Sequence, residues 1–286
     1  MKKIKWIEIS DVESRSAGRA RFETLSSLLS ESGVENEIVL QETTGEDLQT
    51  SLKSAMAGFD QIRISGSIGS NVLEHFDNVP LSSKQIGAAD ALVKADGKWW
   101  PRNFLFDGIL RAVVSDVKKL NLSGGVFVFG ATTEARAAIG AFARLGYRKF
   151  SISDPREDIG QTFVEQLKKT HFEVQFQFIP RHMITQLPSV HSAGINTLVR
   201  GHDDGALEEL FYFNFLEPMG VWLDLALFPL NEALSEEARA VGAFVESGIS
   251  VAAHTDALWV EACFPSFALD REAYCERLSS ALRSIK

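Results

Sequence analysis

Residues 126–145 contain a short apolar run, Val126–Phe129, followed by a glycine and then by a helical pattern. Four consecutive apolar residues bounded by turn signals are typical of a strand that is buried on both faces, as in parallel sheets. Gly130 ends this run, and Thr133–Leu145 has the apolar spacing of an amphipathic helix. A strand, a tight turn and a helix in this order are the context of a dinucleotide-binding turn. The segment therefore predicts an α/β fold with a parallel sheet.

Strand and helix patterns alternate in the first part of the chain as well. They predict a β-α-β-α-β order, which favours a mostly parallel sheet. A hairpin around Asp96-Gly97 is expected to follow this sheet. The predicted segments are Ile4–Ile9, Ala17–Glu31, Glu37–Leu40, Glu46–Ala57 and Gln61–Ser65.

The second half of the chain predicts a further set of strands and helices. Helical periodicity is also expected over Ser235–Glu246, and closing helices at 254–263 and 270–285. We therefore expect an α/β substrate domain at 1–103 and a Rossmann-like dinucleotide-binding domain at 104–235, with residues 236–286 packing back onto the first domain. The expected strands are Phe150–Ser153, Phe172–Phe178, Ala193–Val199 and Val221–Ala226, with a helix at Gln161–Thr170.

Composition restricts the class of protein. A chain of 286 residues with 45% hydrophobic residues can bury the cores of two domains. A net charge of −9 provides no basic field for nucleic acid. Cys263 and Cys275 have neither metal-ligand spacing nor a disulfide framework, so we predict no metal. Without a signal-like or membrane-spanning run, the sequence predicts a soluble cytoplasmic protein, either a monomer or a homodimer.

Three short segments carry a resemblance to a known family. They are Arg63–Gly69, Gly87–Asp90 and Phe106–Gly108. Their order and spacing resemble the NVTxPxK, GAVNT and NTDG segments of the shikimate dehydrogenase family, which are nicotinamide-dependent oxidoreductases. The resemblance implies that Gly69 stands in the place of the catalytic Lys and that Asp107 is the partner Asp of that Lys.

The resemblance also implies a substrate site. Ser14 and Ser16 match the two serines that bind the substrate carboxylate in the family, although both could instead cap the following helix. Arg63, Ser65 and Asp90 replace other substrate contacts of the family. Arg19 and Arg21 could assist a carboxylate or could be solvated on a helix face. Because neutral amides are replaced by apolar and charged residues, we expect a small carboxylate other than shikimate as ligand.

The cofactor prediction rests on two strand ends. Gly130, Ala131, Thr132 and Thr133 match the family's diphosphate turn, where a helix N-terminus meets the phosphates. Only one glycine of the usual three remains, so we expect weak binding, with no binding as the alternative. Asp154 at the next strand end suits the ribose hydroxyls of NAD, whereas Arg156 could favour NADP. The sequence predicts NAD or NADP, with NAD preferred; Asp154-Pro155 could also be a simple turn.

Two residues remain as proton acceptors. Asp107 without the Lys is a weak base for an alcohol, and His254, which replaces a substrate-contacting Gln of the family, could take that role. Two functions follow from these residues. One is a diverged NAD(P)-dependent oxidoreductase that acts on another small carboxylate. The other is a sensor or binding protein that has kept the fold without catalysis.

Overall fold

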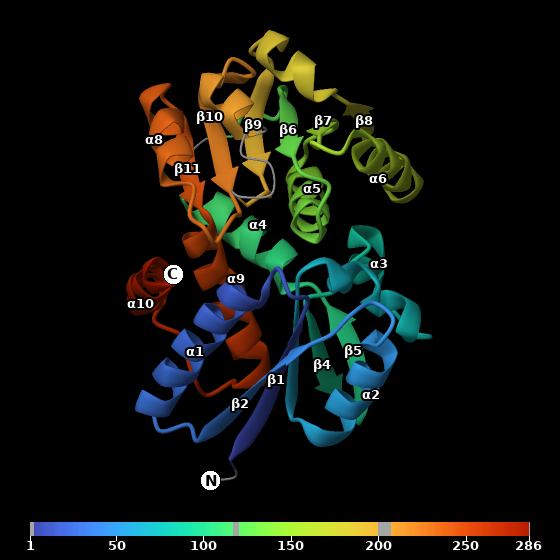
Figure 1. Cartoon of the computed structure of the whole chain (residues 1–286), viewed down its shortest axis with the longest axis vertical. Coiled ribbons are helices and arrows are strands. Elements are labelled where there is room, and N and C mark those ends of the chain that lie inside the picture. Colours follow the sequence, from blue (N-terminus) through green and yellow to red (C-terminus); the bar gives the residue numbers. More distant parts are fainter. Residues whose placement is uncertain (1–2, 117–119, 200–206, 286) are drawn as a thin grey trace. The chain divides into compact units, whose positions relative to one another are not determined.

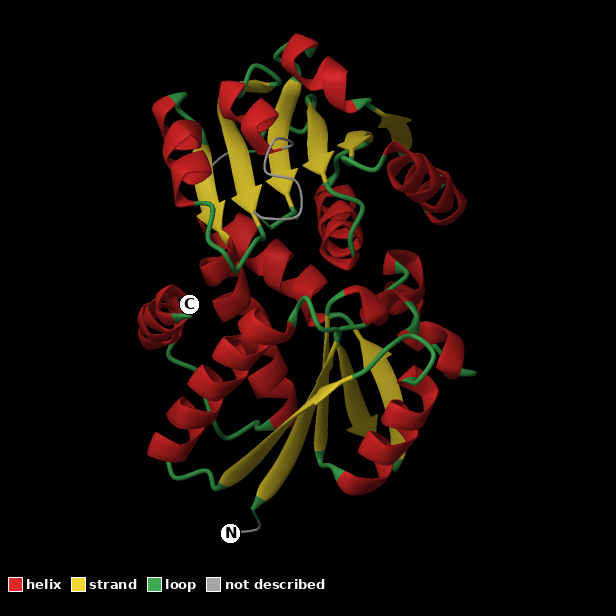
Figure 2. Ribbon diagram, viewed as in Figure 1, coloured by secondary structure: helices red, strands yellow, loops and turns green. Residues whose placement is uncertain are grey.

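The computed structural model describes residues 3–116, 120–199 and 207–285. The chain divides into two compact units, Met1–Gly108 with Ala252–Lys286 and Ile109–Val251. Each unit has its own sheet with helices packed on it (Figures 1 and 2). The two crossings between units lie within helix α4 (Phe104–Asp116) and helix α9 (Gly248–Cys263).

The sheet of the first unit has the order β2-β1-β3-β4-β5. Strands β1, β2 and β3 are parallel, and β4 and β5 form an antiparallel hairpin at one edge. Asp96 and Gly97 both have positive φ, which matches the predicted hairpin turn. The elements are β1 (Ile4–Ser10), α1 (Arg15–Glu31), β2 (Asn36–Glu42), α2 (Leu48–Gly58), β3 (Gln61–Ser65), α3 (Leu81–Ile86), β4 (Ala91–Ala95), β5 (Lys98–Arg102) and α10 (Arg271–Ser284), with short 3-10 helices η1 (Ser67–Ser70) and η2 (Val72–His75).

Strand β1 is buried on both faces because helices cover each side of it. Ile7 and Ile9 belong to a core cluster that includes α2. Trp6 points to the opposite face, since successive side chains of a strand alternate. It packs edge-on against Phe22 of α1 and stacks on Trp259 of α9 at a ring separation of 5.3 Å. The C-terminal part of the chain thus contributes to the core on this face.

The sheet of the second unit has the order β11-β10-β9-β6-β7-β8, with all paired strands parallel. Counted from β6, this is the 3-2-1-4-5-6 order of the Rossmann fold, so the predicted fold class is confirmed. The elements are β6 (Gly125–Phe129), α5 (Thr133–Leu145), β7 (Lys149–Ser153), α6 (Glu157–Thr170), β8 (Gln175–Phe178), η3 (Arg181–Gln186), β9 (His191–Asn196), η4 (Glu209–Tyr212), β10 (Leu216–Asp224), α8 (Glu232–Ala240) and β11 (Phe244–Ser247).

One predicted helix is partly wrong. Helix α8 ends at Ala240, and Gly242 follows with φ 86°, a left-handed conformation that terminates helices. Residues 244–247 then form strand β11 beside β10. Residues 236–251 are grouped with the second unit, and the two crossings fall at 108/109 and 251/252.

Candidate functional site

The carboxyl ends of β1 and β3 lie side by side, because the strands are parallel neighbours with Ser10 opposite Ser65. Ligands of open α/β sheets bind at this edge. Glu8 is 1% exposed, and its Oε1 accepts a hydrogen bond of 2.5 Å from the Ser65 hydroxyl. Its Oε2 accepts no hydrogen bond from the described residues and lies 4.0 Å from Nε of Arg63. This edge therefore carries a buried carboxylate oxygen that still needs a donor.

Asp11 connects the loop after β1 with the loop after β3 through hydrogen bonds. Its carboxylate accepts hydrogen bonds from the backbone N–H of Ser14 at 2.8 Å, and from the N–H and the hydroxyl of Ser67 at 2.6 and 2.8 Å. Gly66 has φ 83°, and a Cβ there would lie 2.3 Å from Oδ2 of Asp11. Only glycine leaves room for this carboxylate. The sequence analysis missed Asp11; an Asp shortly before a helix with a Ser three residues on is the signal of such a turn.

The two serines predicted to bind a carboxylate lie at the start of α1. Ser14 precedes the helix but makes no side-chain capping bond, and Ser16 is exposed in the first turn. Oγ of Ser14 and Oδ2 of Asp11 lie 2.4 and 2.3 Å from the same point, the Cβ position of Gly66. A ligand carboxylate at Ser14 would thus meet the carboxylate of Asp11. Arg19, considered for the same site, pairs with an exposed residue one turn along α1.

Arg63 lies inside an ion-pair cluster of the first unit. Its Nη1 is 2.9 Å from Oδ1 of Asp256, to which Arg21 donates at 2.8 and 3.3 Å. The Tyr274 hydroxyl donates to the same carboxylate. Burial raises the pKa of Asp256, but the guanidinium groups of Arg21 and Arg63 outweigh it, and the pKa is lowered overall. Because both cations pair with Asp256, the fold already uses them, together with the Trp259 ring 5.3 Å below Arg63.

Asp90 caps helix α4. Its carboxylate accepts the backbone N–H groups of Phe104 and Leu105 at 2.8 and 2.6 Å. Burial raises the pKa of Asp90 to about 6, against the opposing effect of these two bonds. Asn103, which the sequence analysis missed, accepts the N–H of Phe106 at 2.9 Å. The predicted ligand contact Asp90 thus orients the helix that carries Asp107.

Asp107 lies half-buried in the first turn of α4. The next residue, Gly108, approaches α9 so closely that a Cβ would lie 2.1 Å from Oγ1 of Thr255 and 2.9 Å from its backbone. A glycine is required for this contact. The structure therefore brings Asp90 and Asp107 to one helix start, which packs on the turn of α9 that contains Thr255.

His254 lies on α9, is 2% exposed and contacts α10. Nη1 of Arg271 lies 2.7 Å from its Nε2 and 2.9 Å from its Nδ1. A guanidinium only donates, so a ring nitrogen of His254 must accept. That nitrogen cannot at the same time take a proton from an alcohol. The role of His254 as a general base stays a prediction, and this contact opposes it.

In the second unit, the turn between β6 and α5 has the geometry of a dinucleotide-binding turn. Gly130 has φ 107°, and a Cβ there would lie 2.3 Å from Oγ1 of Thr197. Thr132 caps α5, since its Oγ1 accepts the N–H of Ala135 at 3.1 Å. Thr133 begins the helix, whose first-turn amides are the usual partners of a phosphate. Residues 131–133 all carry side chains, unlike the glycine-rich turns that are usual in dinucleotide-binding folds.

Asp154 follows β7 and is fully buried. Its Oδ2 accepts the N–H of Ala131 at 2.7 Å, and its Oδ1 accepts the N–H and Nε–H of Arg156 at 2.9 and 3.3 Å. The carboxylate thus links the two strand ends that the sequence predicts as the cofactor site. The Arg156 side chain is 60% exposed, so its outer nitrogens remain accessible to solvent.

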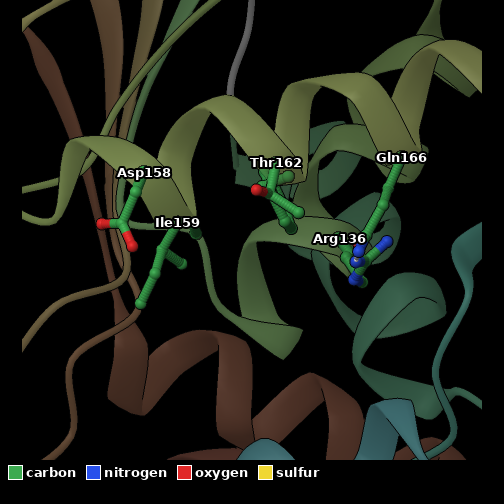
Figure 3. A pocket seen from close by; sticks show the side chains of 7 residues that line it. Arg136, Asp158, Ile159, Thr162 and Gln166 are labelled. Carbon is green, nitrogen blue, oxygen red and sulfur yellow. Dashed lines mark hydrogen bonds between the residues drawn. The ribbon is translucent and has the colours of Figure 1, made fainter.

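A shallow pocket of about 210 Å³ adjoins the turn at Ala131. It lies between α5 and α6, and Figure 3 shows Arg136 and Gln166 pointing toward one another across it. Arg136 donates to Gln166 and lies 4.7 Å from the ring of Phe163. Burial lowers the pKa of Arg136. The sequence analysis missed this cation, although it stands one turn into the helix that follows Gly130.

Within residues 3–116, 120–199 and 207–285, no cluster of His, Cys, Asp and Glu side chains could hold a metal ion. Among the helices in the same ranges, none has the length and apolarity to cross a membrane.

Comparison with known proteins agrees with this architecture. No protein-family model matches the chain. The NADP-dependent shikimate dehydrogenase of Shouchella clausii is 25% identical over 191 residues, which cover 66% of this chain and 68% of that protein.

Two solved structures share the whole fold. The Thermus thermophilus shikimate 5-dehydrogenase, in complex with NADP(H) and shikimate, superposes with a TM-score of 0.75 at 20% identity, covering 98% of this chain and 100% of that one. The Corynebacterium glutamicum quinate dehydrogenase, in complex with NAD, gives a TM-score of 0.78 at 18% identity, with 97% and 99% covered. This chain is therefore similar in sequence to a shikimate dehydrogenase and has the fold of shikimate and quinate dehydrogenases.

Proposed function

We propose that this protein is a nicotinamide-dinucleotide-dependent oxidoreductase that does not act on shikimate. The observation that carries the proposal is the β6–α5 turn, where Gly130 is held at φ 107° against Thr197 and Asp154 receives the amide of Ala131. This turn lies at the carboxyl edge of a sheet with Rossmann strand order. The NADP and NAD complexes of the two structural relatives support the same cofactor class.

The residues present fit such a cofactor. Gly130, Ala131, Thr132 and Thr133 would hold the diphosphate, and the buried carboxylate of Asp154 would fix this turn by accepting the N–H of Ala131. We propose a preference for NAD, since a buried carboxylate disfavours the phosphate of NADP. When bound, a nicotinamide accepts or donates a hydride. The protein itself then has to bind the alcohol or ketone, orient it and exchange a proton with it.

The proton exchange differs from that implied by the family resemblance. Residue 69 is a glycine and supplies no side chain for it. Asp107 remains at the start of α4, held there by the cap that Asp90 forms. We propose Asp107 as the acceptor, with a lower rate than a matched base provides, because a carboxylate is a weak base for an alcohol.

A non-catalytic binding protein is the second candidate. It is favoured by the contact of His254 with Arg271, which occupies a ring nitrogen that catalysis would need. Gly69 has no side chain to exchange a proton, and Arg271 occupies a ring nitrogen of His254. Both observations are consistent with a protein that binds a ligand without converting it.

Calorimetric titration with NAD and NADP distinguishes the two candidates. We expect both to bind, NAD more tightly, and Asp154→Ala to weaken NAD about tenfold, because the N–H of Ala131 loses the acceptor that fixes the turn. Asp158→Ala, which removes a carboxylate from the adjacent pocket, is the matched control. Turnover is then followed by nicotinamide absorbance with shikimate, quinate and neutral polyols. If neither nucleotide binds, the non-catalytic candidate is favoured. Rapid oxidation of shikimate would contradict the proposal that the protein does not act on it.

A further inference from the structure

Strand β2 forms one edge of the first sheet and pairs only with β1 within the described chain. The N–H of Thr43 donates to the C=O of Ser10, and the N–H of Ile4 donates to the C=O of Glu35. These two bonds show that the odd-numbered residues of this segment direct their backbone groups toward β1. The N–H and C=O groups of the even-numbered residues therefore face outward, and the described part of the chain supplies no hydrogen-bond partner for them. These residues are Asn36, Ile38, Leu40 and Glu42.

The other edge strands of the two sheets carry features that hinder pairing with a further strand. Strand β5 contains Lys98 and Pro101, and strands β8 and β11 are only 4 residues long. Lysines, prolines and short lengths are common means of protecting a sheet edge. Strand β2 has 7 residues in unbroken register with β1 and contains no Lys, Arg, Pro or Gly. Among the strands that the structure describes, β2 is thus the edge best able to accept another strand.

The side chains of β2 also suit a covering strand. Residues 38–40 at its centre are apolar, yet no residue of β2 is buried, whereas Trp6–Ser10 of the neighbouring β1 are all buried. The two acidic residues of β2, Glu37 and Glu42, each form an ion pair with a lysine or an arginine of the same chain. The edge therefore offers apolar surface and outward backbone groups without an uncompensated charge.

We infer that β2 pairs antiparallel with β2 of a second copy of this chain, so that the two first sheets become one continuous sheet in a two-fold dimer. A two-fold axis places the same surface of both copies in contact. With Val39 on the axis, all 7 residues of β2 are used and no two like charges are opposed. The opposed pairs are then Asn36 with Glu42, Glu37 with Gln41, and Ile38 with Leu40.

This register also satisfies the outward backbone groups. In an antiparallel pair, alternate opposed residues exchange both of their backbone hydrogen bonds. Ile38 and Leu40 of the two copies would do so, while their apolar side chains lie beside one another on one face. The strand is thus complementary to itself, which favours a second copy over an unrelated partner.

Analytical ultracentrifugation of the full-length protein, without nucleotide and across a concentration series, tests the inference. The chain mass is 31.6 kDa, and we expect twice this mass as the concentration rises. Ile38→Lys places a charge opposite an apolar residue of the second copy and should raise the dissociation constant of the dimer roughly a hundredfold.

Two further variants serve as a second test and a control. Leu40→Pro removes an outward N–H without removing a bond to β1, and it should weaken the dimer in the same direction. Gln175→Lys adds a charge at an exposed position of edge strand β8 in the other unit and should leave the dimer unchanged. Circular dichroism verifies that each variant is folded.

Single cysteines test the register without disrupting the strand. Val39 would lie opposite itself in a non-hydrogen-bonded pair, where the Cα atoms are about 4.5 Å apart, which is within reach of a disulfide. Val39→Cys should therefore form a covalent dimer on mild oxidation. Gln41→Cys, on the same face of β2, would lie about 14 Å from its counterpart and should not. The wild type, which retains Cys263 and Cys275, gives the background.

Three results would overturn the inference. They are a single chain mass at every concentration, a dimer that both Ile38→Lys and Leu40→Pro leave intact, and equal covalent dimer formation by Val39→Cys and Gln41→Cys. The first result is also expected if the edge instead accepts a strand of another protein. None of these measurements involves a nucleotide or a substrate, so the inference and the proposed function can fail separately.

Discussion

Arg63 on β3 and Asp256 on α9 form an ion pair of 2.9 Å in which both side chains are almost completely buried. The pair joins the central part of the first sheet to a helix from the far end of the chain. Arg21 and Tyr274 complete the coordination of the same carboxylate. Arg63, an arginine that could bind an anionic ligand, is therefore used inside the first unit to pair with Asp256.

Removing the carboxylate should destabilise the protein strongly. Asp256→Ala removes the carboxylate that both Arg21 and Arg63 contact and leaves only the more distant Glu8 beside Arg63. Breaking such a buried pair costs about 3–5 kcal/mol. Urea denaturation followed by circular dichroism measures the change. Glu23→Ala, which removes an exposed partner of Arg19, should leave stability nearly unchanged. A loss in Asp256→Ala no larger than in this control would mean that the cluster contributes little.

Gly130→Ala should lower both stability and dinucleotide affinity. Its φ of 107° disfavours any side chain, and the new Cβ would lie 2.3 Å from Oγ1 of Thr197. Gly97→Ala is the matched control, because Gly97 has φ 74° with no atom within 4 Å of a Cβ. Both variants carry a backbone penalty of about 1–2 kcal/mol. Only Gly130→Ala should weaken NAD in calorimetry, and equal effects would place the cofactor elsewhere.

Thr132→Ala should cost about 1 kcal/mol of stability, because Oγ1 of Thr132 caps the N–H of Ala135. Thr132→Ser keeps the hydroxyl and should restore most of the loss. Thr133→Ala, one residue into the helix, provides the comparison. Thermal unfolding of the three variants measures the order, and a larger loss in Thr133→Ala would contradict the assignment of the cap.

The stability of the protein should fall as pH rises through the range in which Asp90 ionises. Burial raises the pKa of Asp90 to about 6, above the value near 3.9 of an unfolded chain. The folded state then binds the proton more tightly, so the contribution of Asp90 to stability decreases from about pH 4 to about pH 6 and stays low above it.

Asp90→Asn removes this titration and should reduce the difference in Tm between pH 5 and pH 7 by roughly 2–4 °C. Asp96→Asn, in the exposed hairpin turn, should leave the difference as in the wild type. An unchanged pH dependence in Asp90→Asn would show that another group is responsible.

The sequence predicted the elements whose patterns are local. Thr133–Leu145 has the predicted bounds, because a strand, a glycine and a capped amphipathic helix are adjacent in the chain. Strand β11 was missed because the helical spacing of apolar residues in the sequence continues past Gly242. In the structure, the positive φ of Gly242 ends the helical segment. The apolar pair Phe244-Val245 after that glycine was the available signal.

The candidate site was harder to predict because its contacts connect distant positions. Arg21 and Asp256 are 235 positions apart, and no spacing rule relates them. The comparison of motifs therefore predicted that Arg63 contacts a ligand, although in the structure Arg63 pairs with the buried Asp256 on α9. Asp11 was missed for a different reason. Two of its three donors are backbone N–H groups, and the only local signal was the spacing of Asp11 and Ser14 before a helix.

The first unit is made from both ends of the chain, and this determines the order in which it can be completed during synthesis. Trp6 and Arg63 emerge from the ribosome long before Trp259 and Asp256, which cover and neutralise them. Residues 109–251 have a sheet of their own and can fold during that interval. The face of the first sheet that carries Trp6 can therefore be covered by Trp259 only after α9 has been synthesised.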